Sequence, residues 1–150
     1  MGIDPKDLNR VLRRSHYPTP TINEIYPELS RAKVFSTVDA KNGFWHVELN
    51  DDSSCLTTFN SPFGRFCWLR LPFGLCTTPE EFQRILNHTL KGLKGIRTIH
   101  DDILVFGEGS TEGEALVDHN RNLRSLMQRC CEQNVKLNKA KVKLRCSWVI

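Results

Sequence analysis

Two apolar arms that meet at a pair of carboxylates constrain the fold of this chain most. The stretch from Ile96 to Phe106 is rich in β-branched and apolar residues, and His100-Asp101-Asp102 interrupts it. Short arms of this kind are typical of paired β-strands buried in a sheet. A tight hairpin usually carries Asn-Gly or Asp-Gly at its bend, because the turn needs positive φ angles. The sequence therefore predicts a β-hairpin whose bend carries acids for a reason other than turn geometry.

Two amphipathic helices flank this hairpin. Thr78 fits an N-cap, Pro79 the first helical position and Glu81 the capping box of a helix that continues to about residue 93. A second helix, about 114–133, is predicted from an apolar stripe at helical spacing. The stripe consists of Leu116, Leu123, Leu126, Met127 and Cys130. We expect both helices to pack against the sheet that contains the hairpin.

The rest of the chain has the pattern of short strands and turns. Strands are expected at 33–38, 45–49, 55–59, 65–71 and 142–150, a short helix at 22–30, and turns at 41–43, 50–54 and 61–64. The opening stretch, 4–17, is expected to be irregular. Strands that precede and separate the helices, with prominent hairpins, predict an α+β fold in which an antiparallel sheet has helices packed on one face.

The composition is that of one globular domain. The chain has 150 residues, of which 39% are hydrophobic and 25% charged. No stretch reaches about 18 consecutive apolar residues, and the N-terminus has no apolar signal core. We therefore expect neither a membrane span nor secretion, and a cytoplasmic or nuclear location. The six cysteines include no C-x-x-C pair, so free thiols are expected rather than disulfides or structural zinc.

The chain is mildly basic, with a formal net charge of +4, which is compatible with nucleic-acid binding. The distribution of charge is more informative than the net charge, because many of the basic residues are grouped in two runs. The second run contains no acidic residue. The runs are Lys6, Arg10, Arg13 and Arg14, and then Lys136, Lys139, Lys141, Lys143 and Arg145. Each run is either a solvated face or a surface that contacts phosphates, and the sequence leaves both interpretations open.

The two Asp-Asp pairs are expected to differ in role. Asp51-Asp52 lies among Asn and Ser residues, where local turn hydrogen bonding explains it. Asp101-Asp102 lies between apolar arms, where adjacent carboxylates repel each other unless a cation lies between them. Mg²⁺ takes oxygen ligands and usually shares them with substrate phosphates. The second pair is therefore a candidate metal site, with a structural turn as the alternative.

A third carboxylate, Asp39, closes the apolar strand 33–38. If that strand lies beside the hairpin, Asp39, Asp101 and Asp102 meet at one edge of the sheet. Three carboxylates around two divalent ions about 3.5–4 Å apart suit an in-line phosphoryl or nucleotidyl displacement. Taken singly, Asp39 is more simply explained as a turn former at a strand end, so the prediction depends on the order of the strands.

Several motifs occur in an order that narrows these alternatives. They are Phe35-Ser36-Thr37-Val38-Asp39, Leu71-Pro72-Phe73-Gly74-Leu75, Pro79 with Phe82-Gln83, and Asp101-Asp102-Ile103-Leu104-Val105. Together they resemble the motifs of reverse transcriptases, most closely those of long-terminal-repeat retrotransposons of the gypsy type. Tyr17-Pro18-Thr19-Pro20 and Leu137-Asn138 with Lys141 also fit, so the resemblance covers nearly the whole chain. It implies a polymerase palm-like fold with incomplete fingers and no thumb. Residues of about 1–38 and 45–75 would form the junction of fingers and palm, and the remainder mostly palm.

The resemblance implies an RNA-directed DNA polymerase. Such an enzyme transfers a nucleotide from a deoxynucleoside triphosphate to the 3′-hydroxyl of a primer paired to an RNA or DNA template. Asp39, Asp101 and Asp102 would be the catalytic and metal-binding residues. They would hold two Mg²⁺ ions, for which Mn²⁺ can substitute, with Asp102 as the supporting carboxylate.

Four further residues would bind the nucleotide, again as an implication of the resemblance. Phe44 corresponds to the aromatic residue that lies beneath the sugar and excludes a 2′-hydroxyl. Phe73 and Gly74 would line the nucleotide pocket, and Gln83 would lie on the helix beneath it. Gly74 would allow the backbone to approach the template or nucleotide because it has no side chain.

The chain departs from the family pattern at Ile99, where Tyr is usual. The basic finger strands are expected before Ile3, and the primer grip and thumb after Ile150. Ribonuclease H, protease and integrase segments are expected elsewhere in the parent element. Two alternatives to the polymerase remain at this point: a catalytically inactive retroelement-derived fragment that at most binds nucleic acid, and a fragment without function.

Overall fold

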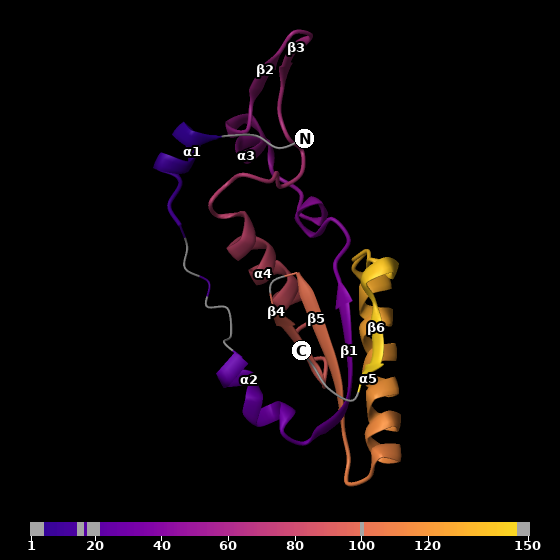
Figure 1. Cartoon of the computed structure of the whole chain (residues 1–150). Coiled ribbons are helices and arrows are strands. Elements are labelled where there is room, and N and C mark those ends of the chain that lie inside the picture. Colours follow the sequence, from indigo (N-terminus) through magenta and orange to yellow (C-terminus); the bar gives the residue numbers. More distant parts are fainter. Residues whose placement is uncertain (1–4, 15–16, 18–21, 100, 147–150) are drawn as a thin grey trace. The chain divides into compact units, whose positions relative to one another are not determined.

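A computed structural model describes residues 5–14, 17, 22–99 and 101–146 (Figure 1). The helices are α1 (Lys6–Val11), α2 (Ile22–Leu29), α3 (Asp51–Leu56), α4 (Thr78–Thr89) and α5 (Glu112–Glu132), with 3₁₀ turns η1 (Gly43–His46) and η2 (Lys139–Lys141). The strands are β1 (Ala32–Asp39), β2 (Phe59–Ser61), β3 (Gly64–Phe66), β4 (Ile96–Ile99), β5 (Asp102–Glu108) and β6 (Lys143–Cys146). The chain folds as two compact units, residues 1–17 with 42–85 and residues 18–41 with 86–150. Within the described residues, no helix is both long and apolar enough to cross a membrane.

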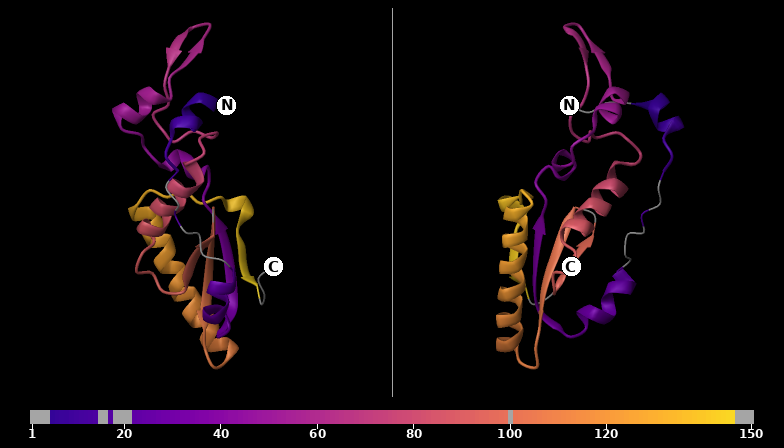
Figure 2. Two further views of the ribbon diagram at one scale, coloured as in Figure 1. Left: turned by 90° about the vertical axis from the view of Figure 1, so that its left-hand side faces the viewer. Right: turned by 180° about the vertical axis from the view of Figure 1, so that it is seen from behind.

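The second unit is built on a four-stranded sheet with the order β4-β5-β1-β6. All three neighbouring pairs are antiparallel, and α5 lies along the sheet against β1 and β5 (Figure 2). The predicted α+β class with an antiparallel sheet is therefore confirmed. The predicted hairpin is also confirmed as β4 and β5, and the strand 33–38 is the inner strand β1, directly beside β5.

The alternation of side chains along β1 and β5 divides the core between the two faces of the sheet. Ser36 contacts α5. Val38, Ile103 and Val105 lie on the same face of the sheet as Ser36 and are fully buried. The other face carries a cluster of Phe35, Leu104 and Phe106, against which Leu29 and Ala32 pack. β5 is buried on both faces and is apolar from Ile103 to Phe106, whereas β1 also buries the polar Ser36.

The buried face of α5 differs in part from the predicted stripe. Leu126 and Cys130 are buried as expected, but Met127 is exposed. The buried positions are Ala115, His119, Asn122, Leu126 and Cys130. The polar members of this set have partners: Asn122 Nδ2 donates to Phe106 O at 2.9 Å, and His119 Nε2 lies 2.8 Å from Ser36 Oγ. A stripe inferred from apolar residues alone misses such positions, because polar side chains are buried where the sheet offers hydrogen bonds.

Gly107 permits the close approach of β5 to α5. A Cβ atom at this position would lie 2.1 Å from Ala115 O and 2.5 Å from His119 N, both of them backbone atoms. Gly107→Ala is therefore expected to lower the free energy of unfolding by about 1–3 kcal/mol, as overpacking does. Urea denaturation measures this loss. Gly113→Ala is the control, because the nearest atom to its Cβ is Thr111 Oγ1 at 4.0 Å. A loss in both variants would contradict the close approach.

Burial lowers the pKa of His119, the charge of Arg145 lowers it further, and Asn120 and Asp118 partly oppose the shift. The folded chain then binds the proton less tightly than the unfolded chain does. The stabilising contribution of neutral His119 is fully present above the ordinary His pKa of about 6.5 and is lost as the pH falls below it. We expect the unfolding midpoint to decrease between pH 7 and pH 5, with a shallower decrease in His119→Gln. Identical slopes in the two proteins would refute this role.

The first unit corrects several predictions for residues 4–71. The expected strand 45–49 begins as the 3₁₀ turn η1, and only its end is extended, with Leu71 N donating to Val47 O at 3.0 Å. The expected turn 50–54 and the start of the strand 55–59 form α3, because Asn50 Oδ1 accepts a hydrogen bond from Ser53 N at 2.9 Å and caps a helix. Asp51 and Asp52 lie in its first turn, where the helix dipole favours acids. The opening stretch contains α1 and is not wholly irregular.

Other predictions for this part of the chain are confirmed. The turn 61–64 closes the hairpin of β2 and β3, in which Ser61 pairs with Gly64. The helix predicted from Thr78 is α4, which ends at Thr89. The Thr78 hydroxyl donates to Pro72 O at 3.0 Å and so connects the helix start to the preceding loop. The bend residue His100 and the chain after Cys146 lie outside the described residues.

Candidate functional site

The three predicted metal-binding acids lie at one end of the sheet of the second unit. Asp39 is the last residue of β1 and Asp102 the first of β5, and their Cα atoms are register partners (Figure 1). Asp101 lies in the turn before β5, and its carbonyl oxygen accepts a hydrogen bond from Ala40 N at 3.2 Å. The condition that the sequence left open, that the strand 33–38 lies beside the hairpin, is therefore met. Strand order alone brings Asp39 to the same sheet edge as Asp101 and Asp102, which lie 62 and 63 positions later in the chain.

The environments of these acids differ. Asp39 is only 7% exposed, whereas Asp101 and Asp102 are exposed. Lys141 Nζ lies 2.8 Å from Asp39 Oδ2. The hydrogen bond and charge of Asp39 raise the pKa of the Lys141 ammonium, and the charges of Asp102 and Asp101 add to the rise. All three carboxylates therefore act on one ammonium group.

The backbone determines the position of Lys141. Lys41 N donates to Lys136 O at 2.8 Å, and Asn138 N donates to Asp39 O at 2.8 Å, so the segment 136–141 is bonded to the chain at the end of β1. Asn138 Oδ1 then accepts from Ala140 N at 3.2 Å and caps η2, of which Lys141 is the last residue. The sequence pattern placed Lys141 in a basic run, but it did not indicate the contact with Asp39.

The chemistry of the acids fits a hard divalent cation, since carboxylate oxygens are the ligands that Mg²⁺ prefers. The position fits as well, because Asp39 and Asp102 are register partners with Asp101 beside them. Over residues 5–14, 17, 22–99 and 101–146, however, no group of three acidic, His or Cys side chains is arranged as a complete metal centre. One carboxylate oxygen of Asp39 is instead bonded to Lys141.

Two of the predicted nucleotide-binding residues contact each other in the first unit. The ring centroids of Phe44 and Phe73 are 4.8 Å apart, and Phe44 also lies 5.5 Å from Phe82 in an edge-to-face arrangement. Trp45 lies 6.2 Å from Phe73. Phe73 is 45% exposed, whereas Phe82 is buried. Phe82 thus supports an aromatic cluster with an accessible side, a contact that the sequence reasoning did not identify.

Gly74 and Gln83 have contrasting surroundings. Gly74 is exposed and has a φ of 105°, which a residue with a side chain rarely adopts. Asn9 holds this loop, since its Nδ2 donates to Gly74 O at 2.8 Å and its Oδ1 accepts from Cys76 N at 2.9 Å. Gln83 lies on α4 and is only 1% exposed. The Gly74 backbone is therefore exposed, whereas the Gln83 side chain is surrounded by protein.

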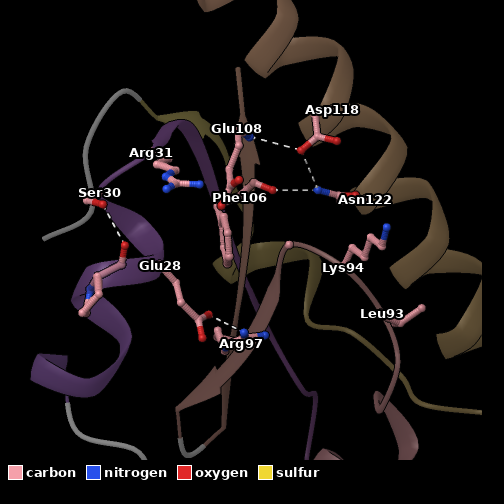
Figure 3. A pocket seen from close by; sticks show the side chains of 12 residues that line it. Glu28, Ser30, Arg31, Leu93, Lys94, Arg97, Phe106, Glu108, Asp118 and Asn122 are labelled. Atoms are coloured by element: carbon pink, nitrogen blue, oxygen red, sulfur yellow. Dashed lines mark hydrogen bonds and ion pairs between the residues drawn. The ribbon is translucent and has the colours of Figure 1, made fainter. Parts of the chain in front are cut away.

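A cavity of about 730 Å³ lies elsewhere in the second unit, beside Phe106 and Glu108 at the opposite end of β5 from Asp102 (Figure 3). Arg97 forms an ion pair with Glu28 across it. Asp118 accepts from Glu108 N at 3.1 Å. Because many of the polar groups around this cavity bond to one another, the candidate chemistry remains with the acids at the other end of the sheet.

Comparison with known proteins points to one family. Residues 1–148 match the family described as reverse transcriptase (RNA-dependent DNA polymerase). The chain is 34% identical over 145 residues to polyprotein P3 of Commelina yellow mottle virus, and 32% identical over 137 residues to the retrovirus-related Pol polyprotein from transposon 297 of Drosophila melanogaster. These matches cover 96% and 90% of the chain but only 7% and 12% of the two polyproteins.

Solved structures give the same result for the fold. A foamy viral protease-reverse transcriptase in complex with double-stranded DNA matches with a TM-score of 0.84 and 26% identity, over 99% of this chain and 25% of that one. The foamy viral protease-reverse transcriptase in complex with an RNA/DNA hybrid matches with a TM-score of 0.76 and 27% identity, over 94% of this chain and 18% of that one. The palm-like architecture expected from the motifs is thus found in known structures of reverse transcriptases.

Proposed function

The chain belongs to the reverse transcriptase family, and from this premise we propose that it carries the nucleotidyl-transfer residues of an RNA-directed DNA polymerase. The observation that supports this most is the pairing of β1 with β5, which brings Asp39 and Asp102 into register. We further assign the parent to long-terminal-repeat retrotransposons of the gypsy type. The similarity to a Drosophila transposon polyprotein supports that assignment.

In this proposal the acids at the sheet end hold two Mg²⁺ ions, or Mn²⁺ in their place. Asp39 and Asp101 supply carboxylate oxygens as ligands, and Asp102 supports them from the start of β5. Bound metal supplies two things at such a site: it lowers the pKa of the attacking primer hydroxyl and stabilises the charge of the leaving pyrophosphate. The rigid pairing of β1 and β5 holds Asp39 and Asp102 in position, because each is backed by buried strand residues.

The aromatic cluster of the first unit is proposed to select the sugar. Phe44 is held by Phe73 and Phe82, so its ring has little freedom to move away from a bulkier sugar. A ring fixed in this way excludes a 2′-hydroxyl by occupying its space. Gly74 exposes backbone that a nucleotide or template can approach. Gln83 is buried on α4, and it is proposed to support the pocket from beneath.

The proposed partners are a primer on an RNA or DNA template and deoxynucleoside triphosphates. The foamy viral relatives were solved with double-stranded DNA and with an RNA/DNA hybrid, which supports this class of partner. Residues of about 1–38 and 45–75 are proposed to form the junction of fingers and palm. The parent polyprotein is proposed to carry thumb, ribonuclease H and integrase parts as well.

Primer extension tests the proposal. The chain is incubated with a labelled primer on an RNA template, deoxynucleotides and Mg²⁺ or Mn²⁺, with a reaction containing chelator as the control. Extension that requires the metal is the expected result. No extension by a folded sample, together with nucleic-acid binding that weakens steeply with salt, would instead identify a fragment that only binds nucleic acid.

A further inference from the structure

The end of β1 holds a carboxylate with a cation already bound to it. Asp39 is 7% exposed, and Lys141 Nζ lies 2.8 Å from its Oδ2. Removing a carboxylate from water is costly unless a positive charge or hydrogen bonds compensate it. Asp101 and Asp102 add two further negative charges at the same sheet end. Without a counter-charge, three carboxylates would repel one another there.

The backbone delivers Lys141 to this position. The segment 136–141 is joined to the end of β1 by the hydrogen bonds from Lys41 N to Lys136 O and from Asn138 N to Asp39 O, both 2.8 Å long. Ala40 and Leu137 form an isolated antiparallel bridge between these two bonds. The Lys141 side chain itself is 63% exposed, so it can move into solvent without disturbing the core. The ammonium is therefore both positioned and able to leave.

The Lys141 ammonium lies on Asp39 Oδ2, so a divalent ion bound to the same carboxylate would be repelled by it. We propose that Lys141 is a built-in counter-ion, which partly neutralises the acids in the metal-free chain and is displaced from Asp39 by charge repulsion when a divalent ion binds. This inference rests on the proposed function for its metal site, but its first half concerns the metal-free chain alone. Lys141 thereby stabilises the fold around the three acids when no metal is bound. Because it competes with the metal, it also lowers the apparent affinity of the site for the first ion.

Mn²⁺ binding tests the competition. Free Mn²⁺ is measured by electron paramagnetic resonance during titration of the wild-type chain, Lys141→Met and Lys139→Met. Lys139 is the matched control, because it lies in the same 3₁₀ turn, is exposed and carries the same charge. Removing a competitor of the strength of an exposed ion pair should tighten Mn²⁺ binding on the order of 5-fold in Lys141→Met, and less than about 2-fold in Lys139→Met.

Thermal unfolding of the metal-free proteins tests the counter-ion role separately. Lys141→Met should lower the unfolding midpoint of the wild-type chain, and saturating Mn²⁺ should restore it. In an Asp39→Asn background, where no charge needs compensation, Lys141→Met should have no such effect. A merely structural lysine would lower the midpoint in both backgrounds, and that result would overturn the inference.

The outcomes separate this inference from the proposed function. If the wild-type chain and Lys141→Met bind Mn²⁺ equally, the competition is refuted while the metal site stands. If no variant, including the wild type, binds Mn²⁺, both the metal site and the competition for it are refuted. Tighter binding in Lys141→Met than in Lys139→Met supports both.

Discussion

Replacement of Asp101 by Asn is expected to reduce deoxynucleotide incorporation by at least about 100-fold, the scale on which the loss of one charge-stabilising group slows a reaction. The amide keeps the size of the side chain but removes the charge that is proposed to hold the metal. Asp101 is exposed, so the variant should fold as the wild type does. Primer extension under single-turnover conditions measures the rate, and circular dichroism confirms the fold.

The chain supplies its own control for this experiment. Asp51 stands in the other Asp-Asp pair, in the first turn of α3, and Asp51→Asn makes the same chemical change. It removes a favourable interaction with the helix dipole, worth about 0.3–1 kcal/mol of stability, and should leave the incorporation rate unchanged. Equal rates for wild type and Asp101→Asn, or a comparable loss in Asp51→Asn, would refute the assignment of Asp101.

Phe44→Val is expected to lower the preference for deoxynucleotides over ribonucleotides by about 10- to 200-fold, the range in which small changes of pocket volume act. The smaller side chain leaves space for the 2′-hydroxyl beneath the sugar. The effect should appear mainly as faster ribonucleotide incorporation, because the acids are untouched. The ratio of kcat/KM for the two nucleotides measures it.

Phe63→Val is the matched control for Phe44→Val, because Phe63 is also in the first unit but is 91% exposed at the tip of the β2–β3 hairpin. It should leave the preference unchanged. If Phe44→Val lost the incorporation of deoxynucleotides and of ribonucleotides together, the ring would serve only to pack against Phe73 and Phe82. An unchanged preference in a folded Phe44→Val would remove Phe44 from sugar selection.

The arrangement of the acids was predictable because it follows from strand patterns. The apolar run before Asp39 and the two arms around Asp101-Asp102 identify strands, and their burial requires a sheet. The sequence did not determine whether β1 and β5 are neighbours in the sheet, and the predicted meeting of the acids depended on that. Strand order depends on long-range pairing, which leaves no local signal.

The elements that sequence reasoning missed depend on single hydrogen bonds. Asn50 serves equally in a turn or as a helix cap, and only its bond to Ser53 N distinguishes them. His119 on α5 is buried against the sheet, where Ser36 of β1 lies within hydrogen-bond distance of its ring. Lys141 reaches Asp39, 102 positions earlier in the chain, because backbone hydrogen bonds join the segment 136–141 to the end of β1. Such pairings have no periodicity that a sequence pattern can reveal.

Paramagnetic broadening by Mn²⁺ tests the central claim, that the acids at the end of β1 and the start of β5 bind divalent metal. The chain has a mass of 17.3 kDa, so its backbone amide signals can be resolved by nuclear magnetic resonance. At low Mn²⁺ concentration, we predict that the signals of Asp39, Ala40, Asp101 and Asp102 broaden first, while that of Asp51 in the other acidic pair is retained. Broadening that begins at Asp51, or that affects all exposed acids equally, would contradict the claim.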